Sequence, residues 1–177
     1  MPPWIEKVVQ RLEPQHDWDD LNLPDGPAAA LERINDRIKS ERGAALKGRS
    51  AASDVTALFA GSETSPKLIA AEALAGGAGT DVYRVDLSMV VSDDLVETER
   101  ILKRILDAAE DAGGVLFFDE GDTLVRPTED DPYPERGAGY LLKRMTRFAG
   151  LSILSVSDRR GVDPALVRRF RFTVTFD

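Results

Sequence analysis

The sequence predicts a three-layer α/β/α sandwich built on a five-stranded parallel sheet. Five short segments rich in β-branched and aromatic residues follow one another along the chain, and segments with helical spacing fill the gaps. Several of the short segments are almost continuously apolar, which is typical of parallel strands covered on both faces. The repeated order of strand and helix therefore favours right-handed crossovers, with helices on both sides of one sheet.

The predicted elements can be placed by residue number. Strands are expected at 55–60, 82–87, 114–119, 152–156 and 171–176, and helices at 27–41, 67–75, 94–111 and 137–148. The helix at 94–111 has the clearest apolar face, because three- and four-residue spacings bring together Leu95, Thr98, Leu102, Ile105, Leu106 and Ala109. Small polar residues at 43–54, and prolines and acids at 126–136, predict irregular connections.

The length of 177 residues allows one core of ordinary size. We expect residues 1–54 to form a lead-in with a helix and a connector, and residues 55–177 to form the α/β core, together as one compact domain. No apolar run approaches the ~18 residues of a membrane span, and the N-terminus lacks the pattern of a secretory signal. A cytoplasmic protein without a membrane partner is therefore expected.

The charged and metal-binding residue types exclude several classes of function. A net charge of −8 opposes nonspecific attraction to nucleic acid, so we expect no nucleic-acid partner. The chain has no cysteine and a single histidine, His16, which argues against disulfides and against a zinc site. Any chemistry must therefore come from carboxylates, lysine, arginine or hydroxyl groups.

The stretch Gly61-Ser-Glu-Thr-Ser-Pro-Lys-Leu68 has the outline of a phosphate-binding loop, GxxxxGK[ST], between a predicted strand and a predicted helix. In such a loop backbone N–H groups, a lysine and a hydroxyl bind the phosphates and the magnesium ion. Pro66 has no N–H to donate, and Leu68 replaces the hydroxyl. The alternative is an ordinary loop with Lys67 on a solvated helix start. The candidate binding residues are Gly61, Ser62, Glu63, Thr64, Ser65, Pro66, Lys67 and Leu68.

A pair of acids ends the apolar segment VLFFDE at 115–120. An aspartate at this place assists magnesium, and a glutamate activates the attacking water. Asp119 is therefore the candidate metal residue and Glu120 the candidate catalytic residue. An isolated pair of acids can also simply cap the next helix.

The chain resembles the AAA+ ATPase family of the P-loop NTPase superfamily, from about His16 to the C-terminus. The matching stretches are HDWDDLNLPD, TALFAGSETSPKLIAAEALA, DVYRVDLSMVVS, ETER, VLFFDEGDTL, YLLKRM and ILSVSDRRGVDPALVRRFRFTVTF. The resemblance implies ATP or ADP and Mg²⁺ as ligands, and the altered loop implies that they bind weakly.

Further residue roles follow from the resemblance alone. The family's first sensor, a polar residue after the fourth strand, falls at Ser157. The arginine that reaches a neighbour's nucleotide falls at Arg168 or Arg169, where a guanidinium can neutralise phosphate charge. Both arginines can equally be solvated surface residues, and the sequence does not choose between them.

The substrate-gripping loop of the family is also altered in this chain. Where the family has an aromatic residue and a glycine, as in KYIGETE, this sequence has Asp94 and Val96 within DDLVETE. Threading of a polypeptide is therefore expected to be lost. Because the sequence ends at Asp177, the helical lid of the family is expected to be absent as well.

Three functions remain open at the level of sequence. The first is a degenerate, pseudo-ATPase module with weakened nucleotide binding and weak or lost hydrolysis, acting as a structural or regulatory interaction subunit. The second is a working ATP-hydrolysing remodelling protein with an atypical loop, supported by Lys67, Asp119 and Glu120. The third is a nucleotide-free module whose acids at 93–94 or 126–136 bind a basic partner. The resemblance suggests that the protein assembles with ring neighbours or another protein partner, although the sequence is also compatible with a monomer. It also suggests association with a contractile injection particle.

Overall fold

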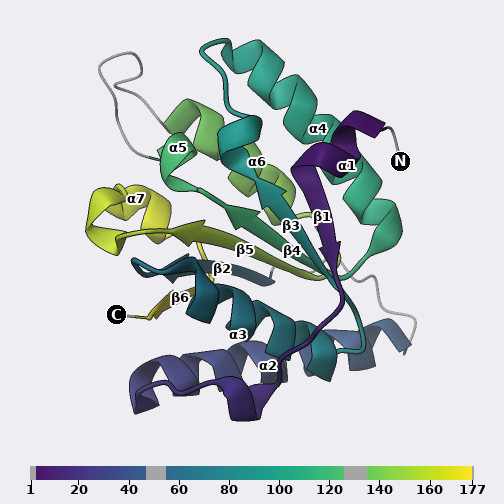
Figure 1. Ribbon diagram of the computed structural model, residues 1–177, viewed down its shortest axis with the longest axis vertical. Coiled ribbons are helices and arrows are strands. Elements are labelled where there is room, and N and C mark those ends of the chain that lie inside the picture. Colours follow the sequence, from purple (N-terminus) through teal and green to yellow (C-terminus); the bar gives the residue numbers. More distant parts are fainter. Residues whose placement is uncertain (1–2, 47–54, 126–134, 177) are drawn as a thin grey trace.

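The computed structural model describes residues 3–46, 55–125 and 135–176, and its centre is a six-stranded sheet (Figure 1). The strands lie in the order β1-β3-β4-β5-β2-β6. Five of them are parallel to one another and match the predicted segments closely. Their bounds are β2 Val55–Ala60, β3 Val82–Asp86, β4 Val115–Asp119, β5 Leu151–Val156 and β6 Phe172–Thr175.

The prediction of a purely parallel five-stranded sheet is corrected by a sixth strand. Strand β1, Val9–Leu12, pairs antiparallel with β3 and forms one edge of the sheet. Only Val9 of its four residues is buried, and Gln10 and Arg11 are exposed. Such a half-solvated edge strand lacks the continuous apolar run that predicts the inner strands.

Helices cover both faces of the sheet and complete three layers (Figure 1). On one side, α2 (Asp25–Leu46) and α3 (Thr64–Gly77) pack on a core that includes Phe59, Phe117 and Ile153. On the other side, α1 (Pro3–Val8), α4 (Leu95–Ala112), α5 (Asp122–Val125), α6 (Glu135–Met145) and α7 (Pro164–Val167) contribute to a second core. Single helical turns lie at Trp18–Asp20, Leu87–Met89 and Arg159–Gly161.

Helix α4 shows how the sequence pattern becomes packing. Five of its six predicted core positions, from Thr98 to Ala109, are buried, but Leu95 is exposed because it lies in the first turn. Asp94 is the N-cap residue, and its carboxylate accepts hydrogen bonds from the N–H groups of Val96 and Glu97. The helix therefore begins where a side chain satisfies its free backbone donors.

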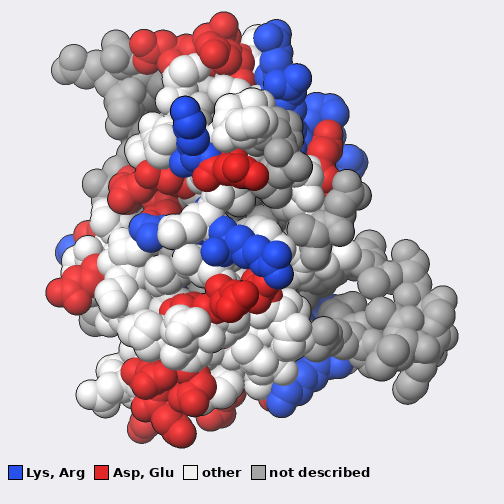
Figure 2. Space-filling model, turned by 45° about the vertical axis from the view of Figure 1, so that its right-hand side comes forward, with Lys and Arg blue, Asp and Glu red and all other residues white. Residues whose placement is uncertain are grey.

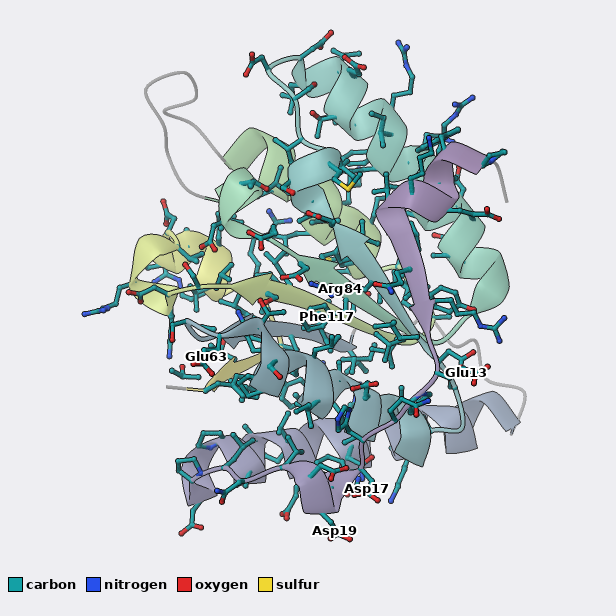
Figure 3. All side chains as sticks on the ribbon, in the orientation of Figure 1. Glu13, Asp17, Asp19, Glu63, Arg84 and Phe117 are labelled. Carbon is teal, nitrogen blue, oxygen red and sulfur yellow. The ribbon has the colours of Figure 1, made fainter. Side chains whose placement is uncertain are left out.

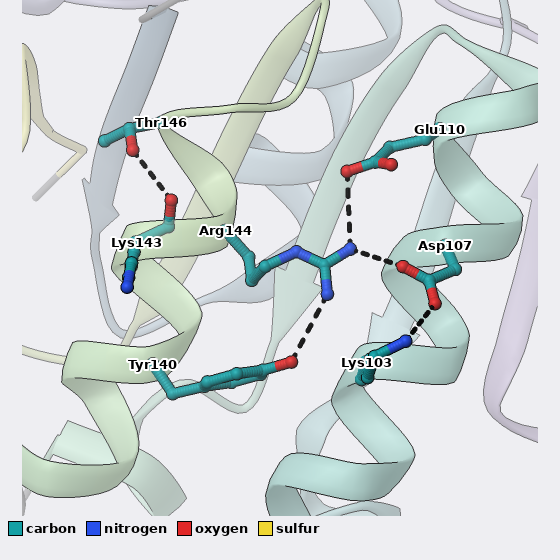
Figure 4. Close-up of polar contacts among 7 residues, drawn as sticks. All are labelled: Lys103, Asp107, Glu110, Tyr140, Lys143, Arg144 and Thr146. Atoms are coloured by element: carbon teal, nitrogen blue, oxygen red, sulfur yellow. Dashed lines mark hydrogen bonds and ion pairs between the residues drawn. The ribbon is translucent and has the colours of Figure 1, made fainter.

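A polar cluster joins α4 to α6 on this side of the molecule (Figure 4). Arg144 of α6 donates hydrogen bonds to Asp107 (2.7 Å), Glu110 (3.3 Å) and the Tyr140 hydroxyl (3.3 Å). Asp107 also accepts a bond from Lys103 at 2.8 Å. The hydrogen bonds from Lys103 and then Arg144 lower the pKa of Asp107 below its ordinary value.

The lead-in crosses from the sheet edge to the α2–α3 layer. His16 Nδ1 lies 2.7 Å from Oε2 of the buried Glu72 on α3, and the Gln15 N–H donates to the same carboxylate. Helix α2 continues through Leu46, so residues 43–46 of the predicted connector are helical. Residues 135–136 of the predicted loop likewise begin α6. The remaining parts of those two connections, 47–54 and 126–134, lie outside the described residues.

The surface carries both signs of charge. Figure 2 shows acidic and basic side chains interspersed over one face. None of the helices in the described ranges is both long enough and apolar enough to cross a bilayer.

Candidate functional site

A small cavity of about 190 Å³ lies where β2, β4 and β5 end. These three strands are neighbours in the sheet and run in the same direction, so their carboxyl ends meet at one edge. Ligand sites of open α/β sheets occur at this edge. The cavity is lined by Ser62, Thr64, Lys67, Asp119, Glu120, Asp122, Ser155, Val156 and Ser157.

The predicted phosphate loop occupies one wall of this cavity. Only Gly61, Ser62 and Glu63 separate β2 from α3, and Glu63 is the N-cap residue, with extended backbone and no side-chain cap (Figure 3). The helix begins at Thr64, three residues before Lys67. The first N–H groups of α3 therefore lie at the cavity, where they can bind an anion.

Lys67 is 3% exposed, so the structure excludes the alternative in which it is a solvated helix residue. Its Nζ donates to the carbonyl oxygens of Gly61 (2.8 Å) and Val156 (2.9 Å). The Gly61 N–H donates to the same Val156 carbonyl at 3.1 Å. The ammonium group thereby ties the loop to the end of β5 and still lines the cavity.

Five of the eight predicted loop residues do not line the cavity. Pro66 is in the first turn of α3, where a missing N–H breaks no helical hydrogen bond but removes one donor from the anion site. Leu68 is partly buried against the apolar core of the α2–α3 layer. Gly61, Glu63 and Ser65 also lie outside the set of cavity-lining residues.

Asp119 ends β4 and is 3% exposed. Its Oδ2 accepts hydrogen bonds from Arg84 of β3, through Nε at 3.0 Å and through Nη2. Its Oδ1 accepts the N–H of Glu120 at 2.8 Å. Arg84 extends over the sheet next to β4 (Figure 3), so the charge of the candidate metal residue is already balanced by a guanidinium.

The turn after Asp119 is strained and tightly packed. Glu120 has a φ of 58°, the left-handed region that side chains with a Cβ avoid. The Gly121 N–H donates to the Ser155 carbonyl at 2.8 Å, and a Cβ on Gly121 would lie 2.6 Å from that oxygen. The turn holds the exposed residue Glu120 at the cavity. Among the described residues, none forms a hydrogen bond or an ion pair with the Glu120 carboxylate.

Two polar residues that the sequence did not single out complete the cavity. Asp122 accepts the Ser157 N–H at 2.9 Å, which joins the acidic turn to the end of β5. Ser155 is buried within β5, and its Oγ has no hydrogen-bond partner among the described residues. The available signals were the third acid of DEGD and the second of two serines in an otherwise apolar strand.

The predicted trans-acting arginines lie elsewhere. Arg168 is the C-cap residue of α7, and Arg169 follows it; both are exposed and neither lines the cavity. The Nη1 atom of Arg169 lies 3.7 Å from where a Cβ on Gly139 of α6 would be. The two side chains are therefore accessible to a neighbouring chain.

Residues 93–99, DDLVETE, which correspond to the predicted substrate loop, do not line the cavity. Asp94 caps α4, as described above, and so has a structural reason to be an acid. Val96 is 65% exposed, and Met89 is exposed as well. The loop thus presents apolar side chains next to Asp93 and Asp94, with no aromatic ring among its residues.

The residues around the cavity supply few ligands for a magnesium–phosphate complex. Three carboxylates, Asp119, Glu120 and Asp122, and one lysine, Lys67, line the cavity. The formal charges of these four side chains sum to −2. A metal ion would offset this excess, but residue 68 supplies no oxygen ligand and Asp119 is paired with Arg84. Within the described ranges no group of three or more His, Cys, Asp or Glu residues is arranged to hold a metal ion.

Comparison with known proteins identifies the family. Residues 57–177 match the family described as "ATPase family associated with various cellular activities (AAA)". The chain is also 30% identical, over 181 aligned positions, to an uncharacterized AAA family ATPase, y4kL, of Sinorhizobium fredii strain NBRC 101917 / NGR234. That match covers 96% of this chain and 52% of the relative, so the chain spans about half of the relative's length. The chain belongs to the AAA family of P-loop ATPases.

Proposed function

We propose that the chain is a degenerate AAA module in which nucleotide binding is weakened and hydrolysis is weak or lost, and which acts as a structural or regulatory interaction subunit. The observation that carries this proposal is an acidic cavity beside a loop in which residue 68 lacks the side-chain hydroxyl that would bind magnesium. A triphosphate brought to three carboxylates requires a bound cation to offset their charge.

The size of the defect supports weak binding. The N–H missing at Pro66 and the hydroxyl missing at Leu68 are each worth about 1.5–3 kcal/mol as contacts to a charged ligand. Each loss corresponds to roughly one to two orders of magnitude in affinity. The remaining N–H groups at the N-terminus of α3 and the retained Lys67 leave a site that binds phosphate groups weakly.

Calorimetry tests this proposal directly. ATP and ADP binding is measured with Mg²⁺ for the natural protein and for the double variant Pro66→Gly, Leu68→Thr. We expect at least a tenfold gain in affinity for the double variant. The matched control is Pro66→Gly, Leu68→Val, because valine has the shape of threonine without its hydroxyl. An equal gain in both variants would assign the defect to Pro66 alone, and micromolar binding by the natural protein would refute the proposal.

One observation favours the alternative of a working ATPase. The Glu120 carboxylate is exposed at the cavity and held there by a strained turn, as a water-activating group would be. This function requires Mg²⁺-dependent release of phosphate that Glu120→Gln abolishes. A rate that is the same in the natural protein and in Glu120→Gln would exclude it.

The interaction role rests on the surface beside the N-terminus of α4. Met89, Leu95 and Val96 are exposed apolar residues in a segment that also carries Asp93 and Asp94. Exposed Arg168 and Arg169 provide cationic groups for the acidic cavity of a ring neighbour. Association with ring neighbours, with a basic protein partner or with a contractile injection particle is part of this proposal. Sedimentation velocity with and without ATP tests self-assembly: a ring requires a species several times the mass of the 19.4 kDa chain.

A further inference from the structure

The hydroxyl group of Ser155 is a buried donor without a hydrogen-bond partner among the residues that the structure describes. The residue is 1% exposed, and no described residue lies within hydrogen-bonding distance of its Oγ in suitable geometry. Buried hydroxyl groups are normally hydrogen-bonded to protein or to a bound group. Because Ser155 also lines the cavity, a group held there is the partner that its position allows.

The backbone around Ser155 connects both walls of the cavity. Its carbonyl oxygen accepts the Gly121 N–H of the acidic turn. The carbonyl of the next residue, Val156, accepts both the Gly61 N–H and Lys67 Nζ of the phosphate loop. Ser155 is therefore fixed between the two turns, on the face of β5 that also carries Ile153 and packs toward α3.

We propose that Ser155 is a phosphate-binding residue, whose hydroxyl donates a hydrogen bond to a phosphate oxygen held at the N-terminus of α3. This inference rests on the proposed function, since it concerns the same weak site. Leu68 leaves position 68 without the hydroxyl of the loop motif, and Ser155 supplies a buried hydroxyl from the neighbouring strand β5. The ligand class is a phosphate anion, either free or as the terminal group of a nucleotide.

The chain contains a matched control for this residue on the same strand. Ser152 is also fully buried, and its Oγ also lacks a partner among the described residues. It lies three residues before Ser155 and so faces the opposite side of the sheet, where Leu154 and Val156 belong to the other core. Ser152 does not line the cavity. Replacing either serine by alanine removes one unpartnered buried hydroxyl, and neither change is expected to lower the melting temperature.

The experiment is an amide NMR titration of the natural protein, Ser155→Ala and Ser152→Ala. The probes are inorganic phosphate, ADP and adenosine, each raised in the presence of Mg²⁺ to roughly 20 mM, where sites of millimolar affinity are occupied. We expect phosphate and ADP to shift the amide signals of Thr64 and Ser65, and adenosine to leave them in place. Ser155→Ala should raise the Kd for phosphate and ADP about tenfold, and Ser152→Ala by less than about twofold.

Each other result has a definite meaning. Equal Kd values for Ser155→Ala and the natural protein, or equal weakening by both serine variants, would overturn the assignment of Ser155. Absence of phosphate and ADP binding by the natural protein would overturn it too, while leaving the loss of hydrolysis intact. Micromolar Mg²⁺–ATP binding with turnover would instead refute the proposed function, and the ratio of Kd values between the two serine variants would still decide the role of Ser155.

Discussion

The two turns beside the cavity differ in how many of the expected nucleotide-binding groups they retain. The turn from β2 to α3 has an unstrained N-cap residue, and the start of α3 lacks two groups that would bind phosphate and magnesium, at Pro66 and Leu68. The turn from β4 to α5 keeps both acids and holds Glu120 in a strained conformation. The difference follows from packing: Gly121 touches the β5 backbone, whereas Leu68 has an apolar core beside it that accepts an apolar side chain.

Among substitutions around the two turns, we expect Arg84→Met to change the free energy of unfolding most. The change leaves Asp119 buried without its counter-ion, and we expect a loss of about 3 kcal/mol in the free energy of unfolding. Urea denaturation provides the measurement. The double variant Arg84→Met, Asp119→Asn should recover part of the loss. If the double variant is as unstable as the single one, Arg84 stabilises the turn by packing and not by charge.

Gly121→Ala tests how tightly the acidic turn is fixed. A Cβ would lie 2.6 Å from the Ser155 carbonyl oxygen and 2.8 Å from Leu154 Cδ1. We expect a loss of about 2 kcal/mol, since backbone must move to admit the methyl group. Gly26→Ala is the control, because nothing lies within 4 Å of its added Cβ. Equal stability of the two variants would show that the acidic turn is as adaptable as the loop.

A third region, the contact of α4 with α6, serves as a reference for the stability that partly exposed ion pairs contribute. Arg144→Met removes hydrogen bonds to Asp107, Glu110 and Tyr140, and should cost about 1 kcal/mol at pH 7. The folded pKa of Asp107 is lowered, so its contribution is present above its unfolded pKa and is lost as pH falls through the folded pKa. The cost of the substitution should therefore shrink in acid, as measured by urea denaturation at several pH values. A cost independent of pH would assign it to lost packing.

The smallest effect is a gain in stability. Glu120→Gly relieves the left-handed conformation and should raise the free energy of unfolding by about 0.5–1 kcal/mol. Glu120→Ala keeps a Cβ and should give no such gain. A loss of stability in Glu120→Gly would mean that the turn is not strained and would weaken the contrast with the loop.

The sequence predicts the parallel strands because their apolar runs are continuous and are separated by helical patterns. It fails at β1, since the four residues VQRL are too few, and do not alternate apolar and polar, to be distinguished from a loop. At the site, motif spacing places Lys67, Asp119 and Glu120 together. The same spacing could not identify Ser155 or Arg84, because their roles depend on which strands are neighbours in the sheet. Helix ends such as Leu46 also depend on tertiary packing.

The contact between His16 and Glu72 gives the molecule a built-in reporter. His16 is the only imidazole in 177 residues, and it sits against the helix whose first turn forms the phosphate-loop wall of the cavity. Its ring protons give isolated NMR signals that change if the lead-in separates from α3. Whether a ligand at one end of α3 disturbs the segment packed along that helix can therefore be followed at a single side chain, without any label.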